Sequence, residues 1–163
     1  MSKNPEFLIA LQGTKNARVQ KNYKILLADD DADDRELFAE AVQECGAEIE
    51  CVPNGAKLMK KLRALESMPD CIFLDLNMPE KGGKECLHEI RRDDKLRNIP
   101  VLIYSTSSNK RDIDETYELG ANRYVTKPTS FMMLKKTVRE LLAMDQKDIQ
   151  GKPDRSAFVF AVS

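Results

Sequence analysis

The chain has 163 residues, of which 42% are hydrophobic and 33% charged, and its net charge at pH 7 is −1. This length suits one domain of ordinary size, and the composition is that of a globular rather than a disordered chain. A nearly neutral chain gives no electrostatic reason to expect nucleic-acid binding. No apolar run approaches the roughly 18 residues of a membrane span.

The cysteines and the single histidine do not form a metal-binding pattern. No two of the four cysteines have the Cys-x-x-Cys spacing of structural zinc sites, and one histidine cannot complete such a site. We therefore expect reduced, mostly buried thiols and a cytoplasmic protein.

Short apolar runs alternate with segments of helical periodicity. The runs, which we expect to be strands, cover residues 25–28, 49–52, 71–74, 101–104 and 124–125. Apolar residues three or four apart predict helices near residues 37–45, 58–65, 86–90, 113–119 and 134–142. Strands that alternate with helices in this way predict an α/β fold, a doubly wound five-stranded parallel sheet with five helices.

The second run differs from the other four. Glu48 and Glu50 alternate with Ile49 and Cys51, as in a strand at a sheet edge, whereas the other runs are apolar throughout. This placement favours the flavodoxin-like strand order 2-1-3-4-5.

Polar residues follow the runs at their carboxyl ends. The first run ends at Asp29 and Asp30, the third at Asp75, the fourth at Ser105 and the fifth at Lys127. In open α/β sheets, ligands bind outside the carboxyl ends of the strands. We therefore expect these carboxylates, the hydroxyl and the ammonium to form one site.

Five aspartates lie within residues 29–34. Two carboxylates about 4 Å apart repel each other by roughly 1 kcal/mol in water and about 4 kcal/mol near a protein surface. A metal ion would offset this repulsion at Asp29 and Asp30. We interpret Asp31 as a solvated neighbour that deepens the negative potential.

The remaining two aspartates have a structural interpretation. Asp33 and Glu36 form a capping-box pattern, which predicts that Asp33 is the N-cap of the first helix. Carboxylates in a first helical turn also meet the positive end of the helix dipole, which accounts for Asp34.

These motifs together resemble the receiver domains of bacterial two-component response regulators. The resemblance covers about residues 23–145 and rests on ILLADDD, FLDLNMP, Gly83, PVLIYST and YVTKP. It implies that a histidine kinase phosphorylates an aspartate, and that the phosphoaspartate shifts the domain toward an active conformation. We predict a receiver domain at 23–145 between an N-terminal tail, 1–22, and a C-terminal tail, 146–163.

The resemblance implies a role for each residue of the phosphorylation site. Asp75 is the phosphoacceptor, a carboxylate nucleophile, while Lys127 and Ser105 contact oxygens of the phosphoryl group. It also implies a cis Lys127–Pro128 bond that aims the lysine, with an ordinary trans turn as the alternative.

The cofactor implied by the resemblance is Mg²⁺. This ion prefers octahedral oxygen ligands, keeps several waters and takes one or two carboxylates. Asp30 and Asp75 are the expected direct ligands, Asp29 a ligand through water, and Asn77 a ligand through its backbone carbonyl.

Two further residues concern the switch between conformations. Tyr124 matches the family's switch aromatic, with a half-buried strand tyrosine as the alternative. Thr106 stands where relatives often have alanine, and its bulk would restrict how Ser105 and Tyr124 rearrange together.

The residues after 145 are too few for a DNA-binding or enzymatic output domain, so we expect signalling through protein contacts. The face built from the fourth helix (113–119), the fifth strand (124–125) and the fifth helix (134–142) is the expected surface for a downstream protein or a second copy. The STSSNKRDI run resembles regulators paired with phytochrome-like kinases. The basic N-terminal tail is interpreted as solvated, with contact to an acidic surface as the alternative.

Two other functions remain open. A phosphorelay shuttle would pass the phosphoryl group from Asp75 to a histidine phosphotransfer protein. A Mg²⁺-dependent phosphoaspartyl hydrolase of the haloacid dehalogenase type would need Asp-x-Asp, and Asn77 stands at the second position. The favoured interpretation is a single-domain response regulator that catalyses only its own phosphorylation and dephosphorylation.

Overall fold

The structure is a computed structural model that describes residues 23–162. Five parallel strands form one sheet in the order β2-β1-β3-β4-β5, which confirms the predicted order. Each strand extends at most one residue beyond its predicted run at either end. The strands are β1 Lys24–Ala28, β2 Glu48–Val52, β3 Cys71–Leu74, β4 Val101–Ser105 and β5 Arg123–Thr126.

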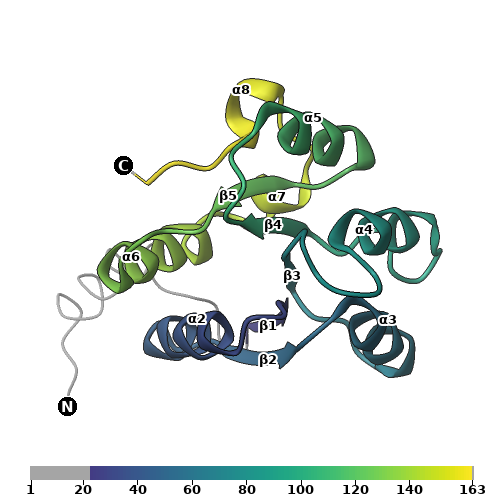
Figure 1. The fold of residues 1–163 in the computed structure, drawn as a ribbon, viewed down its shortest axis with the longest axis horizontal. Coiled ribbons are helices and arrows are strands. Elements are labelled where there is room, and N and C mark those ends of the chain that lie inside the picture. The colour runs from purple at the N-terminus through teal and green to yellow at the C-terminus, as the bar shows by residue number, and fades with distance from the viewer. Residues whose placement is uncertain (1–22, 163) are drawn as a thin grey trace, which may run out of the picture.

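Helices cover both faces of the sheet (Figure 1). One face carries α2 Ala32–Glu44 and α6 Phe131–Leu142, and the other carries α3 Gly55–Ala64, α4 Gly83–Arg92 and α5 Lys110–Leu119. Two short helices follow near the C-terminus, α7 Gln146–Gln150 and α8 Arg155–Phe158. The doubly wound α/β architecture predicted from the sequence is therefore confirmed.

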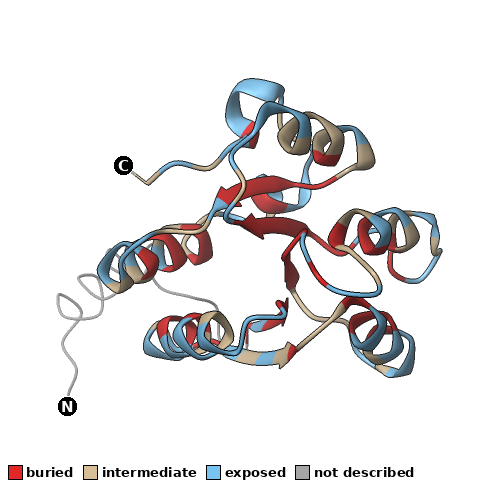
Figure 2. Cartoon of the chain, viewed as in Figure 1, coloured by how far each residue is buried: buried red, intermediate tan, exposed pale blue. Residues whose placement is uncertain are grey.

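The core forms one layer on each face of the sheet, and the central strands are buried (Figure 2). Because strand side chains alternate, Ile72 and Leu74 of β3 pack in the layer under α4 while Phe73 packs in the layer under α2. There the Phe38 and Phe73 rings lie 4.8 Å apart between centroids. In β2, exposed residues alternate with half-buried ones, as an edge strand requires.

The start of α2 differs from the prediction. Asp31, not Asp33, is the N-cap, and its Oδ1 accepts the N–H groups of Asp33 and Asp34 at 2.9 and 3.0 Å. The capping-box assignment was therefore wrong, and so was the interpretation of Asp31 as only a solvated neighbour. The chain enters the helix directly after Asp30, with the Arg35 N–H bonded to the Asp31 carbonyl at 3.0 Å, so Asp33 already lies inside the first turn.

Residues after 145 fold back onto the sheet. Ile149 of α7 and Phe158 of α8 are buried, one in each core layer. Arg123 Nη2 donates to the Asp148 carbonyl at 2.6 Å, which ties α7 to β5. The division of the chain into a domain and two tails stays a prediction, and the N-terminal tail with its basic residues lies outside the described part of the chain.

Across residues 23–162, none of the helices combines the length and the apolar character needed to cross a bilayer. All four cysteines are free; Cys71 and Cys86 are buried, and Cys45 and Cys51 are partly exposed.

Replacing the cap gives a first test. Asp31→Ala should lower the free energy of unfolding by about 0.5–2 kcal/mol, because two N–H groups of α2 lose their acceptor. Urea denaturation in EDTA measures this without a contribution from bound metal. Asp33→Ala is the matched control and should cost less, since Asp33 contributes only through the helix dipole. An equal loss in both variants would contradict Asp31 as the cap.

Candidate functional site

The predicted site residues lie at one edge of the sheet, beyond the carboxyl ends of four strands. Asp29 and Asp30 follow β1, Asp75 follows β3, Ser105 ends β4 and Lys127 follows β5. The Lys127 N–H donates to the Ser105 carbonyl at 2.8 Å, so the sheet's hydrogen bonding continues to the lysine itself. The backbone that carries these side chains is therefore positioned by the sheet.

Three carboxylates form a group that fits a divalent cation. One oxygen each of Asp29, Asp30 and Asp75 lie within 4.8 Å of one another. Asp29 is fully buried, Asp75 is 5% exposed and Asp30 is exposed. The buried Oδ2 of Asp29 lies 2.7 Å from the Lys127 ammonium, so this oxygen already faces positive charge. All-oxygen ligands suit hard cations such as Mg²⁺ and Mn²⁺.

Lys127 offsets part of this negative charge. Its Nζ lies 2.7 Å from Asp29 Oδ2, 2.8 Å from Asp34 Oδ2 and 3.5 Å from Asp75 Oδ2. The contact with Asp29 is an ion pair with a fully buried carboxylate. Burial lowers the pKa of Lys127, but the three carboxylates outweigh burial and hold this pKa well above its usual range.

Asp34 belongs to the site, although the sequence pattern explained it by the start of a helix alone. It lies in the first turn of α2 and accepts a hydrogen bond from Lys127 Nζ at 2.8 Å. No local pattern signalled this contact, because Asp34 and Lys127 lie 93 positions apart in the sequence. The helix dipole accounted for Asp34 without requiring a second role.

The environment of Asp75 disfavours its charged form. The pKa of this carboxyl is raised to about 6, because burial and, to a lesser degree, the charge of Asp29 outweigh the opposing effect of Lys127. The Asn77 N–H, 3.4 Å from Asp75 Oδ1, also stabilises the charged form. A positively charged partner would therefore stabilise the charged form of Asp75. The role of the Asn77 carbonyl as a metal ligand stays a prediction.

Gly83 holds the loop that carries Asp75. A Cβ at this position would lie 2.2 Å from the Asp75 carbonyl oxygen, and the Gly83 N–H donates to the Leu76 carbonyl at 3.0 Å. Only glycine allows the start of α4 to approach the loop so closely.

The predicted switch residues occupy the loop after β4 and the middle of β5. Ser105 is buried, and its Oγ accepts the Ser107 N–H at 3.1 Å. Tyr124 is fully buried rather than half-buried, and its hydroxyl donates to the Ser107 carbonyl at 2.8 Å. Thr106 points to solvent between these contacts. The roles of these residues in a conformational change stay predictions.

The Lys127–Pro128 bond is trans, because no cis peptide bond occurs within residues 23–162. The preference for a cis bond was therefore wrong. X–Pro bonds ordinarily favour the trans form by about 0.5–1 kcal/mol, and this bond follows that preference. Lys127 is already aimed by its backbone bond to Ser105 and by its ion pairs with Asp29 and Asp34.

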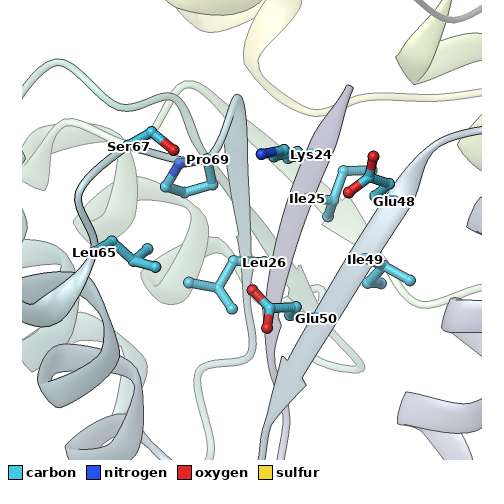
Figure 3. Close-up of a pocket in the computed structure, with 9 residues that line it drawn as sticks. All are labelled: Lys24, Ile25, Leu26, Glu48, Ile49, Glu50, Leu65, Ser67 and Pro69. Carbon is cyan, nitrogen blue, oxygen red and sulfur yellow. The ribbon is translucent and has the colours of Figure 1, made fainter. Parts of the chain in front are cut away.

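A separate pocket of about 170 Å³ lies at the opposite end of the sheet (Figure 3). It is bordered by the starts of β1 and β2, including Lys24, Glu48 and Glu50, and by the loop before β3 with Leu65 and Pro69. No carboxylate of the acidic group lines it, so it plays no part in the chemistry of the site.

The raised pKa of Asp75 predicts a pH-dependent effect on stability. The pKa of Asp75 is about 6 in the folded state against about 3.9 for an unperturbed aspartate, so in the metal-free wild type this carboxyl lowers the stability as the pH rises from about 4 to about 6. In EDTA, Asp75→Asn should therefore stabilise the protein by up to roughly 3 kcal/mol at neutral pH.

The measurement is urea unfolding of both proteins at about pH 4 and about pH 7.5. The gain in the variant should be small at the lower pH and close to its maximum at the higher pH. A gain of equal size at both pH values would contradict the raised pKa.

The sequence and fold both match known proteins. Residues 25–139 match the family model described as response regulator receiver domain. The chain is 36% identical over 123 residues to the probable methanogenesis regulatory protein FilR2 of Methanothrix harundinacea, with 72% of this chain and 79% of that protein covered. It is 34% identical over 122 residues to response regulator Rcp1 of Synechocystis, with 71% of this chain and 83% of that protein covered.

Solved structures of response regulators match this chain in both fold and sequence. The phosphorylated cyanobacterial phytochrome response regulator RcpA superposes with a TM-score of 0.69 at 38% identity, over 74% of this chain and 91% of that one. The Mn²⁺-bound form of Rcp1 gives a TM-score of 0.67 at 33% identity, over 73% and 91%. With its parallel sheet and its acidic edge, the chain belongs to the response regulator receiver domain family.

Proposed function

We propose that the domain accepts a phosphoryl group on Asp75 from a histidine kinase and signals through protein contacts that depend on this phosphorylation. The observation that carries the proposal is the setting of Asp75 at the end of β3. It is grouped with Asp29 and Asp30 and lies 3.5 Å from the ammonium of Lys127. Family membership makes the chain a signalling domain rather than a classical enzyme.

Asp75 is the nucleophile of the transfer. A carboxylate oxygen attacks phosphorus, the phosphorus–nitrogen bond of the phosphohistidine breaks, and its electron pair stays on the ring nitrogen while an acyl phosphate forms. Such a transfer depends on in-line positioning and on stabilising charge on the phosphoryl oxygens. Lys127 contributes that charge, and Ser105 donates its hydroxyl to another phosphoryl oxygen.

We propose Mg²⁺ as the cation of the acidic group. Asp30 and Asp75 bind it directly, Asp29 through water, and Asn77 through its carbonyl. When bound, Mg²⁺ stabilises the negative charge of the phosphoryl oxygens. The ligand set of the described carboxylates supports a hard divalent cation, and the Mn²⁺-bound form of Rcp1 is a relative with a cation of this class.

The proposed donor is a histidine kinase of the phytochrome-like kind. This rests on the similarity to RcpA, a phytochrome response regulator, together with the STSSNKRDI run. A kinase of this kind and four free cysteines fit a cytoplasmic location.

The proposed output is a phosphorylation-dependent contact on the face formed by α5, β5 and α6. Ser105 and Lys127 lie at the rim of this face, so drawing them toward a phosphoryl group moves the loops after β4 and β5. A phosphorelay shuttle would use the same acceptor, but no observation on residues 23–162 favours it. The phosphoaspartyl hydrolase is set aside, since the family match is to receiver domains and Asn77 lacks the required acid.

The acceptor is tested with a radiolabelled small phosphodonor. Acetyl phosphate with Mg²⁺ should label the wild type, because the site itself supplies most of the catalysis, and Asp75→Asn should abolish the label. Asp70→Asn is the matched control: Asp70 stands at the opposite end of β3, and its carboxylate only accepts the Lys24 N–H. Label that persists on Asp75→Asn would sink the assignment.

The place of Asp34 predicts an effect on rate. Asp34→Asn should speed phosphorylation by acetyl phosphate, because one negative charge leaves the site and Lys127 loses a competing partner. The gain should be roughly two- to tenfold, since Asp34 is partly exposed and solvent screens its charge.

Asp33→Asn is the matched control, with the same change of charge one residue away and no described contact to Lys127. Its rate should stay close to that of the wild type. A slower reaction in Asp34→Asn would mean that Asp34 holds the lysine in its productive place, contrary to this expectation.

A further inference from the structure

The segment 152–160 lies along the outer side of α5 and β5 (Figure 1, where α8 sits beside α5). Within it only Phe158 is buried, at 1% exposed, and the residues around it are exposed or half-buried. The Phe158 ring lies 5.1 Å from the Tyr117 ring and 6.2 Å from the Tyr124 ring between centroids. Phe158 is therefore the main anchor of the segment, and the half-buried Phe160 packs against the other core layer.

The backbone of the segment adds to the edge of the sheet. Val159 forms a parallel bridge with Tyr124, and the Phe160 N–H donates to the Tyr124 carbonyl at 2.9 Å. Because β5 is the last strand of the sheet, its outer edge would otherwise present unpaired backbone groups. Addition of an extended segment to a sheet edge is a recurring mode of peptide recognition.

Polar contacts from α5 hold the rest of the segment. Arg155 pairs with Asp114 at 2.8 Å and with Glu118 at 2.5 Å, and its guanidinium lies 4.5 Å from the centre of the Tyr117 ring. The Tyr117 hydroxyl donates to the Pro153 carbonyl at 2.9 Å. These contacts are largely exposed, so each contributes little alone and the segment is held mainly by Phe158.

We propose that the α5–β5 face is a peptide-binding surface whose resident ligand is the chain's own segment 152–160, and that phosphorylation of Asp75 weakens this binding. The surface fits an extended peptide with one aromatic anchor and a basic residue three positions before it, as Phe158 and Arg155 stand. The proposal rests on the proposed function above and adds the ligand of the output face.

A continuous set of contacts links the segment to the phosphorylation site. The Ser105 Oγ accepts the Ser107 N–H, and the Ser107 carbonyl accepts the Tyr124 hydroxyl. Tyr124 in turn packs against Phe158 and pairs with Val159. When the Ser105 hydroxyl turns to a phosphoryl oxygen, it leaves the Ser107 N–H, and the loop that holds the Tyr124 hydroxyl is free to move.

The coupling is reciprocal, as thermodynamic linkage requires. If phosphorylation weakens the docked segment, weakening the segment must strengthen binding of a phosphoryl mimic. The two directions are tested separately below.

The first experiment is amide hydrogen exchange on the full chain, with and without beryllofluoride and Mg²⁺. Residues around 75–77 should become more protected and residues 155–160 less protected. Protection near Asp75 with unchanged exchange at 155–160 would overturn this proposal and leave the proposed function standing. Unchanged exchange at both places would overturn the proposed function as well.

The second experiment weakens the segment without emptying the core. Arg155→Glu should loosen residues 155–160 and lower the dissociation constant for beryllofluoride by roughly fivefold or more. Arg155→Glu with Glu118→Arg restores the pairing in reverse and should return the constant toward that of the wild type. Arg97→Glu is the matched control: Arg97 is exposed, and its described acidic partner is Asp94, at 3.6 Å.

Each outcome of the second experiment either supports or overturns the proposal. A tighter complex in Arg155→Glu, reversed by Glu118→Arg and absent in Arg97→Glu, supports the proposal. An unchanged dissociation constant in Arg155→Glu, although exchange at 155–160 has risen, would overturn it. If exchange at 155–160 does not rise in Arg155→Glu, the dissociation constant for beryllofluoride is measured in Phe158→Ala instead. An unchanged dissociation constant in a folded Phe158→Ala variant also overturns the proposal.

Discussion

The ion-pair cluster around Lys127 is the interaction on which the rest of this structure depends. One ammonium faces the carboxylates of Asp29, Asp34 and Asp75, with Asp30 beside them, so the site carries an excess of negative charge. Burial makes this charge costly, because a buried carboxylate loses hydration that a single lysine replaces only in part. Burial, together with the charge of Asp29, raises the pKa of Asp75 for the same reason. A site with this imbalance favours a cation.

The sheet is what keeps such unfavourable neighbours together. Packing on both faces holds the ends of β1 and β3 in place, and hydrophobic burial there offsets the repulsion at the edge. Gly83 adds a second restraint, since α4 begins in direct contact with the backbone of Asp75. The site is thus built on the ends of packed strands, where the supporting backbone is rigid.

The edge at β5 shows how the same architecture links the site to a surface. Tyr124 reaches the Ser107 carbonyl on one side and contacts Phe158 on the other. A strand at the edge of a sheet exposes backbone groups that can pair with another segment, and here the chain supplies that segment itself. Covering the edge protects it and also brings Phe158 against Tyr124, whose hydroxyl is bonded to the β4–α5 loop.

The sequence by itself determined the strand order and the acidic edge. Apolar runs alternating with helical stripes specify parallel βα units, and parallel strands bring Asp29, Asp30, Asp75 and Lys127 to one edge whatever the details of packing. Local patterns were less reliable, because they placed the N-cap of α2 at Asp33 instead of Asp31. The residue at which a helix begins depends on where the preceding strand ends.

Only the tertiary structure decided the contacts between distant segments. Asp34 reaches Lys127 across 93 positions of sequence, and Phe158 enters the core beside Tyr124 although the pattern around it predicts no element. The trans bond before Pro128 was also decided by the tertiary structure, because ion pairs orient the side chain of Lys127. Periodicity reports which face of an element is buried, but the partner of a single side chain is set by how the elements pack together.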